Sequence, residues 1–206
     1  MKKTIISIVA ATVIGCGCIT TSDPKADYAK YQNYYPEFSI IQTDDAALNE
    51  IQKSVKNINS MVKNQLNSYY NATSANNLYN EVIAEAQKIK QQNRNMTLSQ
   101  ALLQAENAII AYHNLSSGDV DKAVNQGLKT IDRLNPASKI RELTAIVNEL
   151  NNIKLNVGKV KNSFNFKDPT SLTKIRATTS ITEQILYGID AAQFLISQYQ
   201  TAIQLK

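Results

Sequence analysis

Residues 136–164 read PASKIRELTAIVNELNNIKLNVGKVKNSF, and the order of apolar residues in this stretch indicates the fold class. The steps between them alternate between three and four positions: Leu143, Ile146, Leu150, Ile153, Val157, Val160 and Phe164. This spacing gathers them on one side of an α-helix, as in the seam of a coiled coil. Pro136 suits the first position of a helix, where a backbone N–H has no helical partner. The stretch therefore predicts a long helix buried along one stripe.

The same helical period covers most of the chain from Asp44 onward. Helix starts are expected near Asp44, after Ser74, at the Thr97–Gln100 capping box, near Asp119, at Pro136 and at Asp168-Pro169. Six glycines and four prolines are too few for a turn-dense β fold or for Gly-rich phosphate loops. We expect an all-α fold over residues 44–206, an elongated antiparallel bundle of five to six helices with coiled-coil-like packing.

The N-terminus carries a different signal. Met1-Lys2-Lys3 is followed by an uncharged, mostly apolar run that ends at Val13-Ile14-Gly15-Cys16. A positive start and a short apolar run are typical of a secretory signal, and the run is shorter than the roughly 20 residues that span a bilayer. The last four residues resemble the lipobox of bacterial lipoproteins, with an aliphatic residue at −3, a small residue at −1 and then the cysteine.

The lipobox resemblance implies a modified N-terminus. In that family the cysteine, which is Cys16 in this chain, receives a diacylglyceryl group, and the preceding segment, residues 1–15, is removed. The new amine is often acylated too, and two or more acyl chains hold a protein stably on a membrane. Gly17 rather than aspartate follows Cys16, which in enteric-type bacteria favours the outer membrane over the inner. Two alternatives are an ordinary secretory signal and modification of Cys18, which would place Gly15 at −3.

Residues 16–43 are expected to form a tether between the lipid and the bundle. Thr20–Pro24 is polar and turn-like, and Pro36 interrupts any helix around it. Four tyrosines lie between these segments, at positions 28, 31, 34 and 35. They form either an aromatic patch for the membrane interface or a partner, or a short turn packed against the bundle.

The sequence offers no constellation of residues for catalysis, a metal or a cofactor. The single histidine, His113, has no cysteine, histidine or carboxylate three or four residues away, so zinc sites and catalytic triads lack their residues. Glu81, Glu85 and Glu106 lack the Glu-x-x-His partners of carboxylate-bridged metal bundles. Glu85 is instead expected to form an ion pair with Lys88, three residues on. We therefore expect no enzyme.

The charge of the chain is mildly basic, +5 in all and +3 once Lys2 and Lys3 are removed, without the aromatic interleaving that a nucleic-acid partner favours. One basic cluster surrounds the last interhelical turn, with Asp168 as the only acid in that part of the sequence: Lys154, Lys159, Lys161, Lys167, Lys174 and Arg176. The cluster is either a contact for anionic lipid headgroups, lipopolysaccharide or an acidic partner, or the lysine-rich end of a soluble bundle.

The last helix carries more apolar surface than one bundle face needs. The trios Ile185-Leu186-Tyr187 and Phe194-Leu195-Ile196 each spread over about 200° of the helix, whereas a one-sided stripe needs about 100°. Either this helix is central in the bundle, or one edge is open to a partner, formed by Leu186, Tyr187, Phe194 and Leu195.

These features favour a non-enzymatic, lipid-anchored protein of the bacterial cell envelope. Its bundle is expected to bind or scaffold another envelope component, most simply another envelope protein. The alternative is a carrier that holds a small hydrophobic ligand inside the bundle.

Overall fold

The computed structural model describes residues 38–162, 164 and 170–205, so Cys16 and most of the expected tether lie outside the described residues. Within the described part there are six helices and no strand. The helices are α2 (Ala46–Thr73), α3 (Asn77–Gln92), α4 (Leu98–His113), α5 (Ser117–Asp132), α6 (Pro136–Asn162) and α7 (Ser171–Gln204). The prediction of an all-α fold is confirmed.

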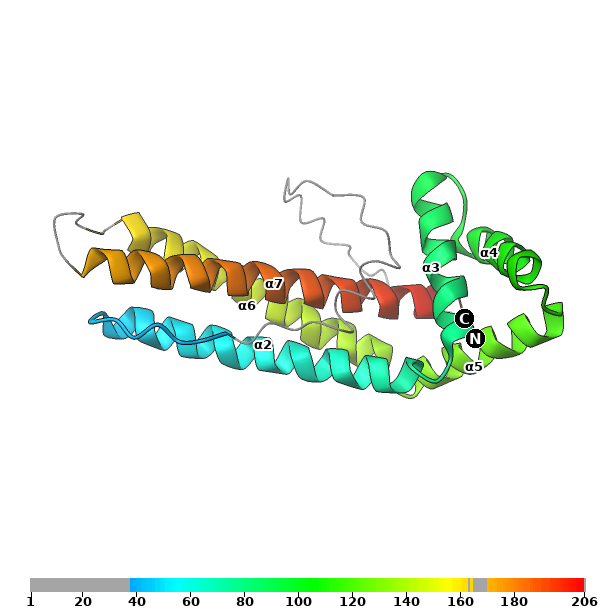
Figure 1. Ribbon diagram of the computed structural model, residues 1–206, viewed down its shortest axis with the longest axis horizontal. Coiled ribbons are helices and arrows are strands. Elements are labelled where there is room, and N and C mark those ends of the chain that lie inside the picture. The colour runs from blue at the N-terminus through cyan, green and yellow to red at the C-terminus, as the bar shows by residue number, and fades with distance from the viewer. Residues whose placement is uncertain (1–37, 163, 165–169, 206) are drawn as a thin grey trace, which may run out of the picture.

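Three long helices, α2, α6 and α7, form an elongated bundle that we call the rod (Figure 1). α6 runs opposite to α2 and α7, as an up-down bundle requires. α7 packs extensively against both α6 and α2, which contact each other less. At 1.5 Å per residue the 34 residues of α7 extend over about 51 Å. The elongated shape of the bundle therefore follows from these three helices.

The three shorter helices, α3, α4 and α5, form a lobe at one end of the rod, beside the C-terminal end of α7 (Figure 1). α3 and α4 pack closely on each other, and α5 contacts both. We call the opposite end of the rod the tip, which comprises the described residues of 44–56 and 154–176. At the tip α2 begins, α6 ends and α7 begins.

The buried apolar residues form two cores of different size. The main core, centred on the rod, joins twenty-two buried residues, among them Leu143, Leu150 and Leu195. The lobe core joins only six, which are Val82, Ala86, Ala105, Ile109, Val120 and Val124. Leu102 and Leu128 contact both cores. Most of the stripe predicted from residues 136–164 lies in the main core or packs against it, and Val160 is the exception.

Helix starts follow the predicted caps closely. Thr97 and Gln100 form the expected capping box at the start of α4. α6 begins at Pro136, directly after Asn135, whose φ of 55° lies in the left-handed region that asparagine adopts more readily than most residues. α5 begins at Ser117, two residues before the predicted start. The predicted start of the last helix at residues 168–169 lies outside the described residues.

Two glycines mark the closest approaches between helices. A Cβ on Gly188 of α7 would lie 2.1 Å from Asn59 Oδ1 on α2 and 3.0 Å from Leu150 Cδ1 on α6. A Cβ on Gly127 of α5 would lie 2.3 Å from the ring of Tyr79 on α3. Atoms do not approach this closely in a packed interior, so both positions require glycine unless the neighbouring side chains move.

Candidate functional site

The tip gathers most of the predicted basic cluster. Its members within the described residues are Lys154, Lys159 and Lys161 near the end of α6 and Lys174 and Arg176 near the start of α7. The adjoining ends of these two helices lie side by side (Figure 1). Lys167 and Asp168 lie outside the described residues.

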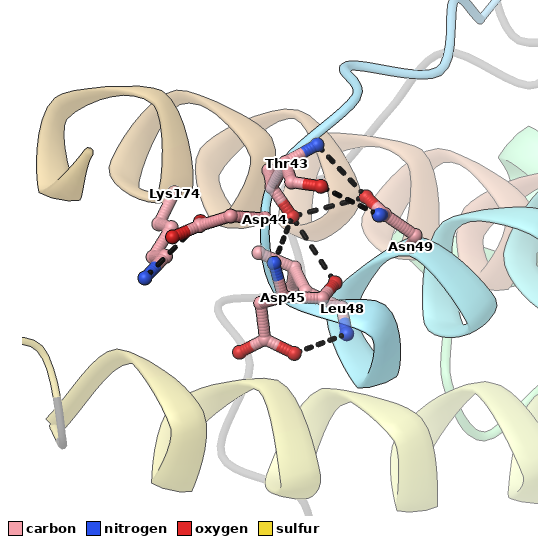
Figure 2. A network of polar contacts seen from close by, with 6 residues as sticks. All are labelled: Thr43, Asp44, Asp45, Leu48, Asn49 and Lys174. Carbon is pink, nitrogen blue, oxygen red and sulfur yellow. Dashed lines mark hydrogen bonds and ion pairs between the residues drawn. The ribbon is translucent and has the colours of Figure 1, made fainter.

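The start of α2 brings acidic residues to the same end, where the sequence analysis did not expect them. Asp44 Oδ1 lies 3.2 Å from Lys174 Nζ, and the Lys174 side chain is only 17% exposed (Figure 2). Asp45 accepts a hydrogen bond from the Leu48 N–H and caps α2. Lys174 is therefore paired with a carboxylate of the same molecule.

Two exposed leucines accompany the cations of the tip. Leu155 of α6 is 67% exposed and Leu172 of α7 is 57% exposed. The sequence analysis missed both. Leu155 follows Leu150 by five residues, or about 140° around the helix, which places it away from the buried stripe. That angle was the signal available in the sequence.

Residues 38–45, which we call the strap, lie along the rod and reach the start of α2 at the tip (Figure 1). Gln52 Oε1 accepts the Ile41 N–H at 2.7 Å, and Gln52 Nε2 donates to the Ile41 carbonyl at 2.8 Å. Asn49 Oδ1 accepts the Thr43 N–H at 3.0 Å, and its Nδ2 donates to the Thr43 carbonyl at 2.8 Å (Figure 2). The two amide side chains satisfy the strap backbone much as a neighbouring β-strand would.

The strap includes the described part of the predicted tether, residues 38–43, and it packs against the rod. Asn49 and Gln52 are buried where they hold the strap, and the Phe38 ring packs edge-on against Tyr187 of α7 at 6.2 Å between centroids. Hydrophobic periodicity gave no signal for this contact because it depends mainly on polar side chains outside the apolar stripe of α2.

The four residues of the predicted partner edge of α7 differ in how deeply they are buried. Leu195 is fully buried in the main core, and Tyr187 and Phe194 are partly buried against it. Only Leu186, at 47% exposure, faces solvent to a large extent. The wide apolar surface of α7 therefore reflects its position between α2 and α6, the first of the two alternatives. Leu195 is not available to a partner, which corrects that prediction.

Two of the three glutamates weighed as metal ligands, and the histidine, contact other side chains. Glu81 Oε2 lies 3.0 Å from His113 Nε2, which links α3 to α4. Glu85 pairs with Lys88 at 3.3 Å, as predicted. Among the described residues, no group of three or more histidine, cysteine, aspartate or glutamate side chains is arranged to hold a metal ion.

A chain of polar side chains joins the rod to the lobe. The Tyr69 hydroxyl donates to Gln198 Oε1 at 3.2 Å, Gln198 Nε2 donates to Gln87 Oε1 at 3.3 Å, and Gln87 Nε2 donates to Thr201 Oγ1 at 2.9 Å. Beside it, burial raises the pKa of Tyr199 to about 12. That phenol therefore stays neutral at physiological pH.

The surface of the lobe carries an open depression of about 480 Å³ at the turn between α3 and α4, lined by Asn93, Asn95, Met96, Gln100, Leu103 and Gln104. In the described part of the chain, no helix combines the length and the apolar character needed to cross a membrane. No family model, curated protein or solved structure matches this chain significantly.

Proposed function

We propose that this chain is a lipid-anchored protein of a bacterial cell envelope, and that its helical bundle binds or scaffolds another envelope component. The observation that carries the proposal is the Val13-Ile14-Gly15-Cys16 tetrad after a short charged and apolar run. The rod and its charged tip are consistent with it, because an elongated bundle offers a long surface for contact. The outer membrane remains the favoured location.

The ligand-carrier alternative has less support among the described residues. In the middle of the rod, α7 lies so close to α2 and α6 that a Cβ on Gly188 would meet Asn59 and Leu150. The depression at the α3–α4 turn lies on the surface of the lobe and outside both cores. Neither place is an enclosed apolar cavity of the kind that a hydrophobic ligand needs.

Fatty-acid labelling of cells tests the anchor. Cys16→Ser should abolish the label and leave the precursor uncleaved, because only the thiol accepts the diacylglyceryl group. Cys18→Ser is the matched control and should keep the label. Undiminished labelling of Cys16→Ser contradicts the proposal, and loss of label in Cys18→Ser alone would move the modified residue to Cys18.

Crosslinking in intact cells tests the binding role. A photo-reactive side chain at exposed positions of the tip, the rod and the lobe, Leu155, Leu186 and Leu103, samples three separate surfaces. We expect one envelope protein to be captured repeatedly from one of these positions and not from the other two. Capture of no protein from any position contradicts a protein-binding role.

A further inference from the structure

Matched pairs of side chains occur on the two helices that meet at the tip. Leu155 precedes Lys159 by four residues on α6, and Leu172 precedes Arg176 by four residues on α7. Residues four apart lie on the same face of a helix, one turn from each other. All four side chains are exposed, with the leucines 67% and 57% accessible. Each helix thus presents an apolar side chain next to a cation at the same end of the rod.

The tip also carries a local excess of positive charge. Its described residues include seven basic side chains and three acidic ones, Asp44, Asp45 and Glu50. Each acid has a partner within the molecule: Asp44 pairs with Lys174, Asp45 caps α2, and Glu50 pairs with Lys53 at 2.7 Å. By contrast, the helices of the lobe and the turns between them, residues 77–132, contain six acidic and five basic side chains. The positive end of the molecule is therefore the tip.

We propose that the tip binds the surface of an anionic lipid bilayer. Leu155 and Leu172 enter the boundary between headgroups and acyl chains, and Lys159 and Arg176 contact the lipid phosphates. Leucines beside cations suit this surface because apolar burial and attraction to anionic lipid both contribute to binding. An acidic protein would satisfy the charge, but two leucines on the outward faces of two different helices fit a broad fluid surface better than a single peptide. The proposal rests on the proposed membrane anchor, which brings the rod close to a bilayer.

The absence of tryptophan from the chain allows a specific test. Leu155→Trp and Leu172→Trp each place one fluorophore at the tip, and Leu103→Trp places one on the lobe, where the native leucine is 60% exposed. The full-length lipidated protein is reconstituted into vesicles of phosphatidylcholine alone or with phosphatidylglycerol, each with brominated acyl chains. The tip variants should show a blue shift and bromine quenching only with phosphatidylglycerol, and Leu103→Trp should show neither.

Charge reversal separates the electrostatic contribution from the apolar one. Each cation near an anionic surface contributes about 1 kcal/mol, or about fivefold in the equilibrium. Lys159→Glu with Arg176→Glu should therefore weaken the contact of the tip by at least about 25-fold and remove most of the quenching. The matched control is Lys122→Glu with Lys129→Glu, at two exposed positions of the lobe. It changes the net charge by the same amount and should leave the quenching unchanged.

Three results would overturn the proposal. They are no quenching of the tip variants on anionic vesicles, equal quenching on neutral vesicles, and quenching that survives reversal of the tip charges. If the tip bound a soluble acidic protein and not lipid, the tip variants would show no quenching on anionic vesicles, which is the first of these results. The fatty-acid label on Cys16 reports the anchor and the tryptophan reports the tip, so failure of one is seen independently of the other.

Discussion

The rod and the lobe are built from the same kind of amphipathic helix, yet they bury very different amounts of apolar surface. The main core contains large side chains such as Leu150, Ile185 and Tyr199, whereas two of the six residues of the lobe core are alanines. The difference comes from helix length, since α2, α6 and α7 have 28, 27 and 34 residues and each lobe helix has 16. A short helix buries too little surface to be stable alone.

The lobe therefore depends on its junction with the rod. Tyr79 and Ile83 of α3 and Ile131 of α5 belong to the main core rather than to the lobe core. The polar chain through Gln87 and Gln198 fixes the orientation of α3 against α7. We expect the rod to fold as the stable unit and the lobe to open locally at a lower free energy.

The largest effect is expected from a charge in the main core. Leu195→Glu should unfold the rod and the lobe together, because an unpaired carboxylate would be stranded among fully buried side chains. Leu186→Glu, on the exposed side of the same helix, should leave the melting temperature nearly unchanged. Circular dichroism during thermal unfolding measures both variants. If the Leu195→Glu protein remained folded, the rod would not be the stable unit on which the lobe depends.

Cavity-forming substitutions separate the two cores more finely. Leu150→Ala and Ile109→Ala each remove a buried side chain and should cost about 2–5 kcal/mol. Because Leu150 lies in the main core, its loss should lower hydrogen-exchange protection in all six described helices. The loss of Ile109 should lower protection only in α3, α4 and α5. Equal loss of protection throughout for Ile109→Ala would mean that rod and lobe unfold as one unit.

A third comparison uses glycines. Gly188→Ala in the rod and Gly127→Ala in the lobe should each destabilise by about 1–3 kcal/mol, because the new methyl group meets atoms that must move. Gly158→Ala is the control, since a Cβ there meets nothing within 4 Å, and it should stabilise α6 by about 0.5–1 kcal/mol. Urea titration gives all three values. If Gly127→Ala left the free energy of unfolding unchanged, the side chains at the α3–α5 contact would move aside at little cost.

The smallest effects concern two glutamates whose pKa values shift in opposite directions. Burial, helped by the charge of Asp121, raises the pKa of Glu106 in the lobe above its ordinary value of 4.5. The folded state then binds this proton more tightly than the unfolded state, so stability is lost as pH rises through the raised pKa. Glu106→Gln should therefore stabilise the protein at pH 7, with the gain vanishing in acid.

Glu142 at the start of α6 is the counterpart in the rod. Its hydrogen bond from Lys139 lowers its pKa below 4.5 despite some desolvation. The stability that this carboxylate provides is present above its ordinary pKa and is lost as pH falls through the lowered one. Glu142→Gln should thus destabilise slightly at pH 7 and have no effect in strong acid. Melting temperatures of both variants between pH 3 and pH 7 test these predictions. If both substitutions changed the stability at pH 7 in the same direction, the assignment would be contradicted.

Much of the fold follows from the sequence because helices are local structures. The three- and four-residue steps around Leu150, the capping box at Thr97 and the position of Pro136 each specify a helix or its start without knowledge of distant residues. The division into rod and lobe does not follow so directly. It depends on which helices meet, as at the contact of Gly127 with Tyr79, and no local pattern encodes that pairing.

The candidate sites were predicted less completely for the same reason. The basic cluster at the tip was found because its members flank one turn in the sequence. The pairing of Lys174 with Asp44 joins residues that are 130 positions apart, so it was not foreseen. The burial of Leu195 was left open because a wide apolar surface fits both a central helix and an exposed edge. Only the arrangement of α7 between its neighbours decides between them.

The strap determines how a mechanical load would enter the molecule. Phe38 contacts Tyr187 at the middle of α7, and the chain continues from there to the tip before α2 begins. A force applied to the chain ahead of Phe38 therefore acts on the side of the rod and not on its end. If the chain is pulled along the rod axis, the hydrogen bonds from Gln52 and Asn49 to the strap bear the force together. If the chain is pulled away from the rod, these hydrogen bonds break one after the other. The direction of the force therefore determines how large a force the strap withstands before α2 is strained.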